Sequence, residues 1–225
     1  DCVLFYRLGD FYEMFFDDAL TVSKELEITL TGKDCGLSER APMCGVPFHA
    51  LDSYLYRLVQ KGYKVAIAEQ MEDPRQAKGL VKREVIRVVT PGTITSSQVL
   101  DETKNNYLMG IVYMDGIYGI STADISTGDF MVTEVDSDRE LFDEINKFSP
   151  SEIICNNAFY MSGVDMDELK NRYQVVISAL DSRFFGEESC RRILMEHFKV
   201  GALVGLGLED YATGIIAAGA VMQYI

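Results

Sequence analysis

Apolar and polar residues alternate with two different periods along the first ninety positions. The short apolar run Val3–Leu8 predicts a buried strand, which Gly9-Asp10 ends before a helix over Phe11–Glu27. The pattern then predicts extended segments at Ile28–Thr31 and Met43–Val46, a polar loop at Gly32–Ala41, a helix at His49–Lys61, and strands at Tyr63–Gln70 and Val81–Val89. Period-two alternation in the last strand places Arg83 and Arg87 on one face. Together these elements predict a mixed-sheet α/β domain over residues 1–90.

The pattern changes after this domain. Residues 91–106 are poor in large apolar side chains and rich in Thr, Ser and Asn, which predicts a linker. Three strand-like runs follow, and the turn Asp115-Gly116 between the first two is a strong hairpin signal. The predicted elements are strands Tyr107–Tyr113, Gly116–Asp124 and Gly128–Val135, a helix Asp138–Phe148, a strand Glu152–Cys155, a helix Asp165–Tyr173, a strand Val175–Leu180 and two further helices. A meander followed by alternating strands and helices is typical of a ribonuclease-H-like domain, here over residues 107–225.

Composition narrows the class of protein. With 225 residues, 48% of them hydrophobic, the chain is long enough for two cores of ordinary domain size. It holds no run of eighteen apolar residues and its start lacks a secretory signal, so we expect neither a membrane protein nor a secreted one. Because the sequence opens at Asp1 without an initiator Met and stops inside a helix-like run, we expect it to be part of a longer protein.

Residues for metal or covalent chemistry are sparse in the sequence. The five cysteines form no Cys-x-x-Cys pair, and neither histidine has a second ligand at metal spacing. The sequence also lacks a G-x-x-x-x-G-K-[ST] phosphate loop and a Gly-x-Ser-x-Gly turn. We therefore expect no metal, no cofactor and no enzymatic activity in this chain.

The net charge of -14 argues against a nucleic-acid-binding protein until it is divided along the chain. Residues 1–90 hold 12 basic against 14 acidic residues, whereas residues 91–225 hold 9 against 21. The acidity therefore belongs to the second half. Within the first half, residues 74–87 carry five basic residues and one acidic residue, which fits either a DNA-contacting stripe or a solvated strand face.

One pair of side chains in the first half suggests a specific chemistry. The ring of Phe11 stands two residues before the carboxylate of Glu13, just after the Gly-Asp turn. Proteins that kink duplex DNA insert an apolar wedge between base steps, with a polar neighbour beside the exposed base. The structural alternative is a capping box formed by Asp10 and Glu13, with the aromatic residues in ordinary core contacts. The residues alone leave both interpretations open.

Four stretches of the chain carry a resemblance to a known family. They are Phe5–Glu13, Pro42–Ala50, Val65–Gln70 and Val88–Thr93. In order and spacing they resemble the MutS family of DNA mismatch-repair proteins, whose N-terminal mismatch-binding domain is followed by a ribonuclease-H-like connector domain. The family carries a Phe-X-Glu pair that recognises mismatches. The resemblance therefore implies binding of mismatched or looped duplex DNA, with Phe11 as the wedge and Glu13 as the hydrogen-bonding partner of the base.

The resemblance also implies further DNA-contacting residues and partners. The implied DNA-binding residues are Phe11, Glu13, Arg83, Met43, Lys33 and Lys78. Of these, Met43 and Lys33 also fit plain roles as core filler and solvated loop charge. For the full-length protein the family implies a homodimer, a MutL-type repair partner, and ATP and Mg²⁺ at an ATPase outside this chain. The implied setting is a bacterial cytoplasm, in association with the nucleoid.

Two rival functions remain to be weighed against DNA mismatch binding. Ribonuclease-H-like nucleases hold two metal ions with several carboxylates, for which Asp115, Asp124 and Asp129 are candidates. Asp124 belongs to a predicted strand, whereas Asp115 occupies the hairpin turn and Asp129 directly follows the turn residue Gly128, where Asp is favoured for backbone hydrogen bonding. The second rival is a protein-docking module whose acidic second half receives a basic partner.

Overall fold

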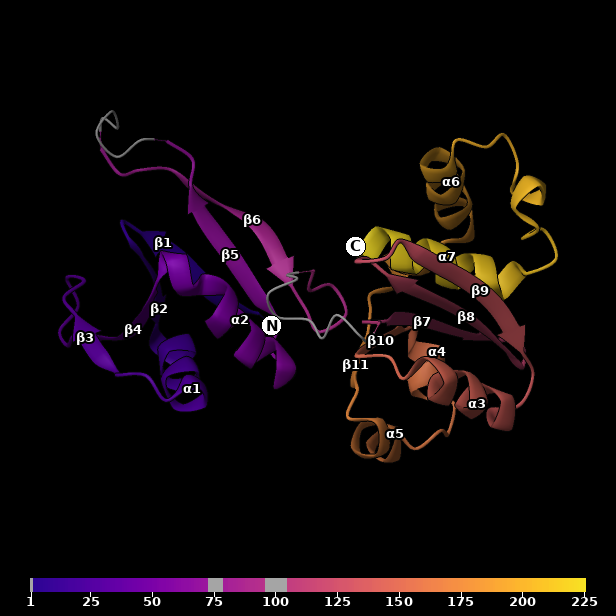
Figure 1. The fold of residues 1–225 in the computed structure, drawn as a ribbon, viewed down its shortest axis with the longest axis horizontal. Helices are drawn as coiled ribbons and strands as arrows, with labels where there is room; N and C mark the ends of the chain where they lie inside the picture. The colour runs from indigo at the N-terminus through magenta and orange to yellow at the C-terminus, as the bar shows by residue number, and fades with distance from the viewer. Residues whose placement is uncertain (1, 73–78, 96–104) are drawn as a thin grey trace. The chain divides into compact units, whose positions relative to one another are not determined.

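The computed structural model describes residues 2–72, 79–95 and 105–225. These residues form two compact units, Asp1–Leu100 and Asp101–Ile225, each with its own sheet (Figure 1). None of the helices in the described ranges has the length and apolar character needed to cross a membrane.

Unit 1 is built on a six-stranded mixed sheet in the order β3-β4-β2-β1-β5-β6. Its elements are β1 (Val3–Leu8), β2 (Phe11–Phe15), α1 (Phe16–Leu26), β3 (Thr31–Lys33), β4 (Ala41–Pro47), the 3-10 turn η1 (Phe48–Ala50), α2 (Leu51–Gln60), β5 (Val65–Gln70) and β6 (Arg83–Val89). β1 and β5 are parallel, and the other neighbouring pairs are antiparallel. The mixed-sheet α/β fold predicted from the sequence is therefore confirmed.

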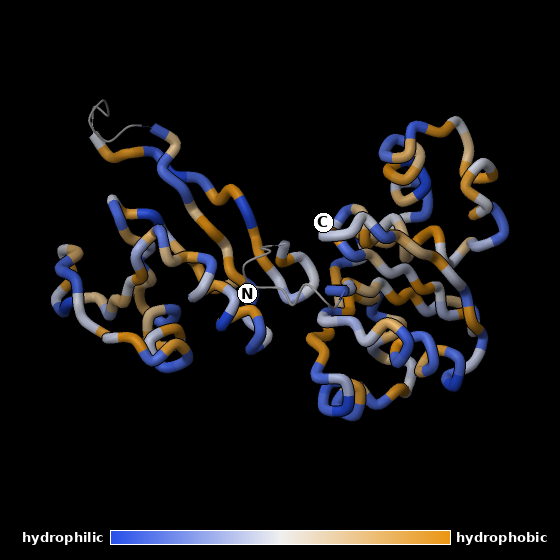
Figure 2. Tube along the Cα trace, in the orientation of Figure 1, coloured by the Kyte–Doolittle hydropathy of each residue, from blue (hydrophilic) through white to orange (hydrophobic). Residues whose placement is uncertain are grey.

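One face of this sheet packs against α1 and α2, where the core lies. Phe5 and Met14 are fully buried there, together with Val65 at the start of a mostly hydrophobic β5 (Figure 2). The opposite face, which we call the open face, carries the alternate residues of the same strands. Its larger apolar side chains remain exposed, among them Leu4, Val85 and Val88.

The helix predicted to start at Phe11 is wrong in its first five residues. Phe11–Phe15 is the strand β2, which pairs with β1 through a tight turn at Gly9, and α1 begins only at Phe16. Tyr12 and Met14 point into the core while Phe11 and Glu13 point to the open face, which is the period of a strand. No capping box at Asp10 and Glu13 exists, because no helix starts there.

The prediction that Arg83 and Arg87 share a face is also wrong. Arg83 pairs with Gln70, on the open face, whereas Arg87 pairs with Ile67, whose side chain belongs to the core. A bulge between Ile67 and Ala68 shifts the register, so the strict alternation assumed from the sequence does not hold along β6.

Unit 2 contains a five-stranded sheet in the order β11-β10-β7-β8-β9. Its elements are β7 (Leu108–Met114), β8 (Ile117–Asp124), β9 (Asp129–Val135), α3 (Asp138–Phe148), β10 (Glu152–Cys155), α4 (Asn157–Tyr160), α5 (Met166–Tyr173), β11 (Val176–Ala179), η2 (Ser182–Phe185), α6 (Glu187–Phe198), η3 (Leu203–Leu206) and α7 (Ala212–Tyr224). The antiparallel meander β7-β8-β9 is extended by β10 and β11, which run parallel to β7. This is the predicted ribonuclease-H-like layout.

Helices cover both faces of the second sheet (Figure 1). α3, α4 and α5 contribute a core with Leu141, Phe159 and Leu169 on one side, and α7 lies across the other. α7 approaches β8 very closely at Gly119, where an added Cβ atom would lie 2.3 Å from the carbonyl of Thr213. Within residues 105–225, helices therefore pack on both faces of the sheet, unlike in unit 1.

Candidate nucleic-acid interface

The turn between β1 and β2 presents Phe11 at the edge of the open face. Gly9 has a φ of +59°, a conformation that glycine adopts without strain, and Phe11 follows as the first residue of β2. The Phe11 side chain is 47% exposed, whereas its neighbour Tyr12 is 4% exposed. Backbone pairing with β1 on one side and β4 on the other fixes the position of the Phe11 backbone in the sheet.

Hydrogen bonds from other segments hold this turn. The backbone N–H of Phe48 donates to the Asp10 carbonyl at 3.0 Å, and the N–H of Gly9 donates to Gln70 Oε1 at 3.3 Å. On the core side, the guanidinium of Arg7 lies 4.1 Å from the ring centre of Phe48. The turn is therefore tied to β5 and to the segment after β4 rather than projecting freely.

On the core face of the sheet, Tyr12 links β2 to β5. Its hydroxyl donates a hydrogen bond to the carboxylate of Glu69 on β5. Burial, together with this hydrogen bond, raises the pKa of Tyr12 above its ordinary value. The phenol thus stays neutral at physiological pH and keeps its role as a donor.

Phe11 and Glu13 point to the same face, as the residue spacing requires in a strand. Phe11 stands opposite Pro47 and Glu13 opposite Gly45 on β4. The Glu13 side chain is only 16% exposed, and Lys33 Nζ forms an ion pair with its Oε2 atom. Lys33 Nζ also lies 5.5 Å from the ring centre of Phe15. Sequence reasoning treated Lys33 and Glu13 as separate residues and gave no signal of this pairing.

Met43 and Arg83 lie on the same open face. Met43 pairs with Phe15 on one side and Thr31 on the other, and its side chain is half-buried. The Arg83 guanidinium donates to the backbone carbonyl of Arg7 at 2.6 Å. It also donates to Gln70 Oε1 at 3.2 Å and lies 5.1 Å from the ring centre of Tyr6.

The structure therefore brings Phe11, Glu13, Met43, Lys33 and Arg83 to one face of the first sheet. Lys78, the sixth candidate, lies outside the described residues. Gln70 is a residue that sequence reasoning missed: its side-chain oxygen accepts from both Gly9 and Arg83 and so links the turn to β6. The sequence feature that could have indicated Gln70 is its position as the last residue of a strand that begins with four apolar residues.

Of the carboxylates nominated for a nuclease site, Asp124 serves the fold of unit 2. Asp124 is buried, and its Oδ2 accepts from the N–H of Asn106 at 3.0 Å while its Oδ1 accepts from the N–H and hydroxyl of Ser126. Asp115 lies in the β7–β8 turn with a φ of 51°. In residues 2–72, 79–95 and 105–225, no group of three carboxylate, imidazole or thiol side chains has a metal-binding arrangement.

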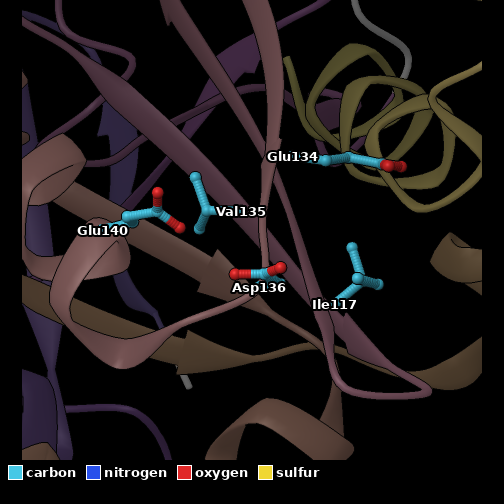
Figure 3. Close-up of a pocket in the computed structure, with 5 residues that line it drawn as sticks. All are labelled: Ile117, Glu134, Val135, Asp136 and Glu140. Atoms are coloured by element: carbon cyan, nitrogen blue, oxygen red, sulfur yellow. The ribbon is translucent and has the colours of Figure 1, made fainter.

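A second acidic group lines a hollow of about 290 Å³ in unit 2, between Ile117, Glu134, Val135, Asp136 and Glu140 (Figure 3). Glu134 points toward α7, where its Oε1 atom accepts from the N–H of Gly214 at 2.8 Å. Glu140 accepts from the hydroxyl of Ser137, the N-cap residue of α3, at 2.9 Å. Through these hydrogen bonds, each of the two side chains binds the N-terminal end of a helix and helps to position that helix.

Comparison with known proteins gives one family for both units. Residues 1–98 match the family model described as MutS domain I, and residues 106–225 match MutS domain II. The DNA mismatch repair protein MutS of Lachnoclostridium phytofermentans is 61% identical over 100% of this chain and 24% of its own length. The proteins of the same name from Acetivibrio thermocellus and Clostridium tetani are 54% and 48% identical, again over 100% of this chain and over 26% and 25% of their lengths. The chain spans about a quarter of the length of these curated relatives.

Proposed function

Because the chain belongs to the MutS family of DNA mismatch-repair proteins and consists of its domains I and II, we propose that unit 1 binds mismatched or looped duplex DNA through Phe11. The Phe11 ring enters the base stack at the weakened step, and Glu13 forms a hydrogen bond with the displaced base. The observation that carries the proposal is the exposure of Phe11 on a strand that also presents Glu13 to the same face.

The selectivity of such a wedge follows from the cost of opening the duplex. Unstacking a base step costs a few kcal/mol, and less where a mispair has already weakened stacking and pairing. Stacking of an aromatic ring on a base returns about 1–3 kcal/mol. The balance is therefore favourable at a mispair and unfavourable at a matched step, so selectivity arises mainly from deformability.

Glu13 contributes by a different route. A carboxylate near phosphates is repelled by their negative charge, and this repulsion is offset only where Glu13 forms a hydrogen bond with a displaced base. In the absence of DNA the same carboxylate is paired with Lys33. Replacing Glu13 by Gln removes the charge and keeps a donor, so we expect Glu13→Gln to retain or strengthen binding while weakening discrimination against matched duplex.

Three basic side chains and Met43 complete the proposed interface. We propose that Arg83, with Met43, Lys33 and Lys78, contacts the minor groove or the sugar-phosphate backbone. Arg83 is oriented by its bonds to Arg7 and Gln70 at the end of the sheet where Phe11 lies. Contacts of this kind fix the register of DNA on the protein and carry little sequence information.

The remaining proposals concern domain boundaries and the whole protein. We propose a mismatch-binding domain at residues 1–90, a linker at 91–106 and a connector domain at 107–225. Ile94, inside the proposed linker, packs in the core of unit 1.

For the full-length protein we propose an ATPase that uses ATP and Mg²⁺ outside this chain, a homodimer, a MutL-type repair partner, and action on DNA in the bacterial cytoplasm at the nucleoid.

Binding of matched and mismatched oligonucleotides to the full-length protein tests the proposed function. In fluorescence anisotropy, Phe11→Ala is expected to abolish the preference for mismatched duplex. Phe16→Ala is the matched control, because Phe16 is a phenylalanine of similar exposure, 52%, that begins α1. Retention of the preference in Phe11→Ala contradicts the wedge, and absence of DNA affinity in every form of the protein favours the docking module.

A further inference from the structure

The ion pair between Lys33 and Glu13 joins two strands that are not neighbours in the sheet. Glu13 lies on β2 and Lys33 on β3, with β4 between them. The residue of β4 opposite Glu13 is Gly45, where an added Cβ atom would lie 3.6 Å from Glu13 Cγ. The small residue on the intervening strand leaves room for the side chain of Glu13 next to β4.

Lys33 neutralises a carboxylate that has little contact with water. Glu13 is 16% exposed at its side chain, whereas Lys33 is 39% exposed. A mostly buried carboxylate is costly unless it is paired, so Glu13 depends on this ammonium more than Lys33 depends on the carboxylate. The ring of Phe15 beside Nζ gives the ammonium a further favourable contact.

We infer that Lys33 is a positioning residue that holds Glu13 away from the bases and releases it only at a mismatch. This inference rests on the proposed function, because it assumes that Glu13 reaches the displaced base. On matched duplex the pair stays closed, and Glu13 makes no contact with a base. At a mismatch Glu13 turns to the base, and the pair with Lys33 is broken.

A lysine that holds Glu13 affects DNA binding differently from a lysine that only contacts phosphate. Breaking the pair costs free energy only in the mismatched complex, so Lys33 lowers the affinity for mismatched DNA relative to matched DNA. A lysine that only contacts phosphate strengthens binding to both duplexes by the same factor. The two roles therefore predict different effects on the ratio of the two affinities.

A double-mutant cycle in the full-length protein tests this inference. Dissociation constants are measured for matched and mismatched duplexes with the unchanged protein, Lys33→Met, Glu13→Gln and the double variant. Lys33→Met is expected to raise the ratio of mismatched to matched affinity about fivefold, the order expected for a partly exposed ion pair. In the Glu13→Gln background, Lys33→Met is expected to leave the ratio unchanged.

Two further variants serve as controls. Lys33→Arg preserves the pair and is expected to keep the ratio of the unchanged protein. Lys61→Met is the matched control, because Lys61 Nζ pairs with Glu25 Oε2 at 2.9 Å on the helix-covered side of unit 1. It is expected to leave the ratio unchanged.

Three results overturn the inference. They are an equal effect of Lys33→Met on both duplexes, a fall in the ratio, and the same change of ratio with and without Glu13. Phe11→Ala, measured in parallel, reports on the wedge independently. If Phe11→Ala loses mismatch preference while Lys33→Met leaves the ratio unchanged, the proposed function stands and only the role of Lys33 fails.

Discussion

The two sheets of this protein differ in how they are covered. In unit 2, helices pack on both faces, and acidic side chains such as Asp124 and Glu134 are used in internal hydrogen bonds. In unit 1, α1 and α2 cover one face, and the other face keeps Phe11, Val85 and Val88 exposed. Exposed apolar groups gathered on one face of a sheet are typical of an interaction surface, so the contrast favours unit 1 for the proposed binding site.

The largest expected effect contrasts two phenylalanines of unit 1. Phe5 is fully buried against the helices, and Phe11 lies on the open face. Phe5→Ala is expected to lower the free energy of unfolding by about 3–5 kcal/mol, and Phe11→Ala by less than about 0.5 kcal/mol. Urea unfolding followed by circular dichroism measures both values, and a comparable loss for Phe11→Ala contradicts a free open face.

The tight packing of α7 on the second sheet predicts the next largest effect. Gly119→Ala places a Cβ atom 2.3 Å from backbone atoms of Thr213, which cannot move as a flexible side chain does. We expect a loss of about 3 kcal/mol in the stability of unit 2. Gly205→Ala is the control, since no heavy atom lies within 4 Å of its added Cβ. Equal stability of the two variants argues against close packing on this face.

The loss of stability at alkaline pH allows the interiors of the two units to be compared. Burial raises the pKa of the Cys155 thiol to about 12 and those of Cys190 and Cys44 to about 11. The folded-state pKa of each thiol lies above the ordinary value of 9.0, so its contribution to stability is complete below pH 9 and is lost as pH rises toward the folded-state value. At pH 10 the loss is about 1.4 kcal/mol per thiol.

Unit 2 holds two of these thiols and unit 1 holds one, so unit 2 is expected to lose more stability between pH 9 and pH 10. Urea unfolding at both pH values measures this loss. Cys155→Ala removes one of the two contributions in unit 2, and a variant whose pH dependence matches that of the unchanged protein disproves the assignment.

The smallest expected effect compares the two faces of β6. Arg83→Gln is expected to weaken binding to matched and mismatched duplexes alike, by about fivefold, and to lower the slope of log affinity against log salt by about one. Arg87→Gln is the control on the same strand, because Arg87 points to the opposite face. Anisotropy titrations at several salt concentrations give both values, and an equal loss for the two variants removes the distinction between the faces.

The sequence allowed some of the candidate site to be predicted and not the rest. Phe11 and Glu13 were identified from their spacing after a turn, and an interval of two residues places side chains on one face of a strand. The strand itself was missed, because Phe11 and Phe15 are also separated by the four-residue interval of an amphipathic helix. The partners of Glu13 and Arg83 could not be identified, since Lys33 and Arg7 approach them only through strand pairing across the sheet.

By itself, the sequence determined the division into two α/β halves, the ribonuclease-H-like succession of elements and the uneven distribution of charge, all of which depend on short windows of residues. The tertiary structure decided that Phe11–Phe15 is a strand, that a bulge separates Arg83 from Arg87, and that Lys33 neutralises Glu13. The physical reason is that a local pattern sets which side chains can be buried, whereas register and ion pairing depend on strands brought together from distant parts of the chain.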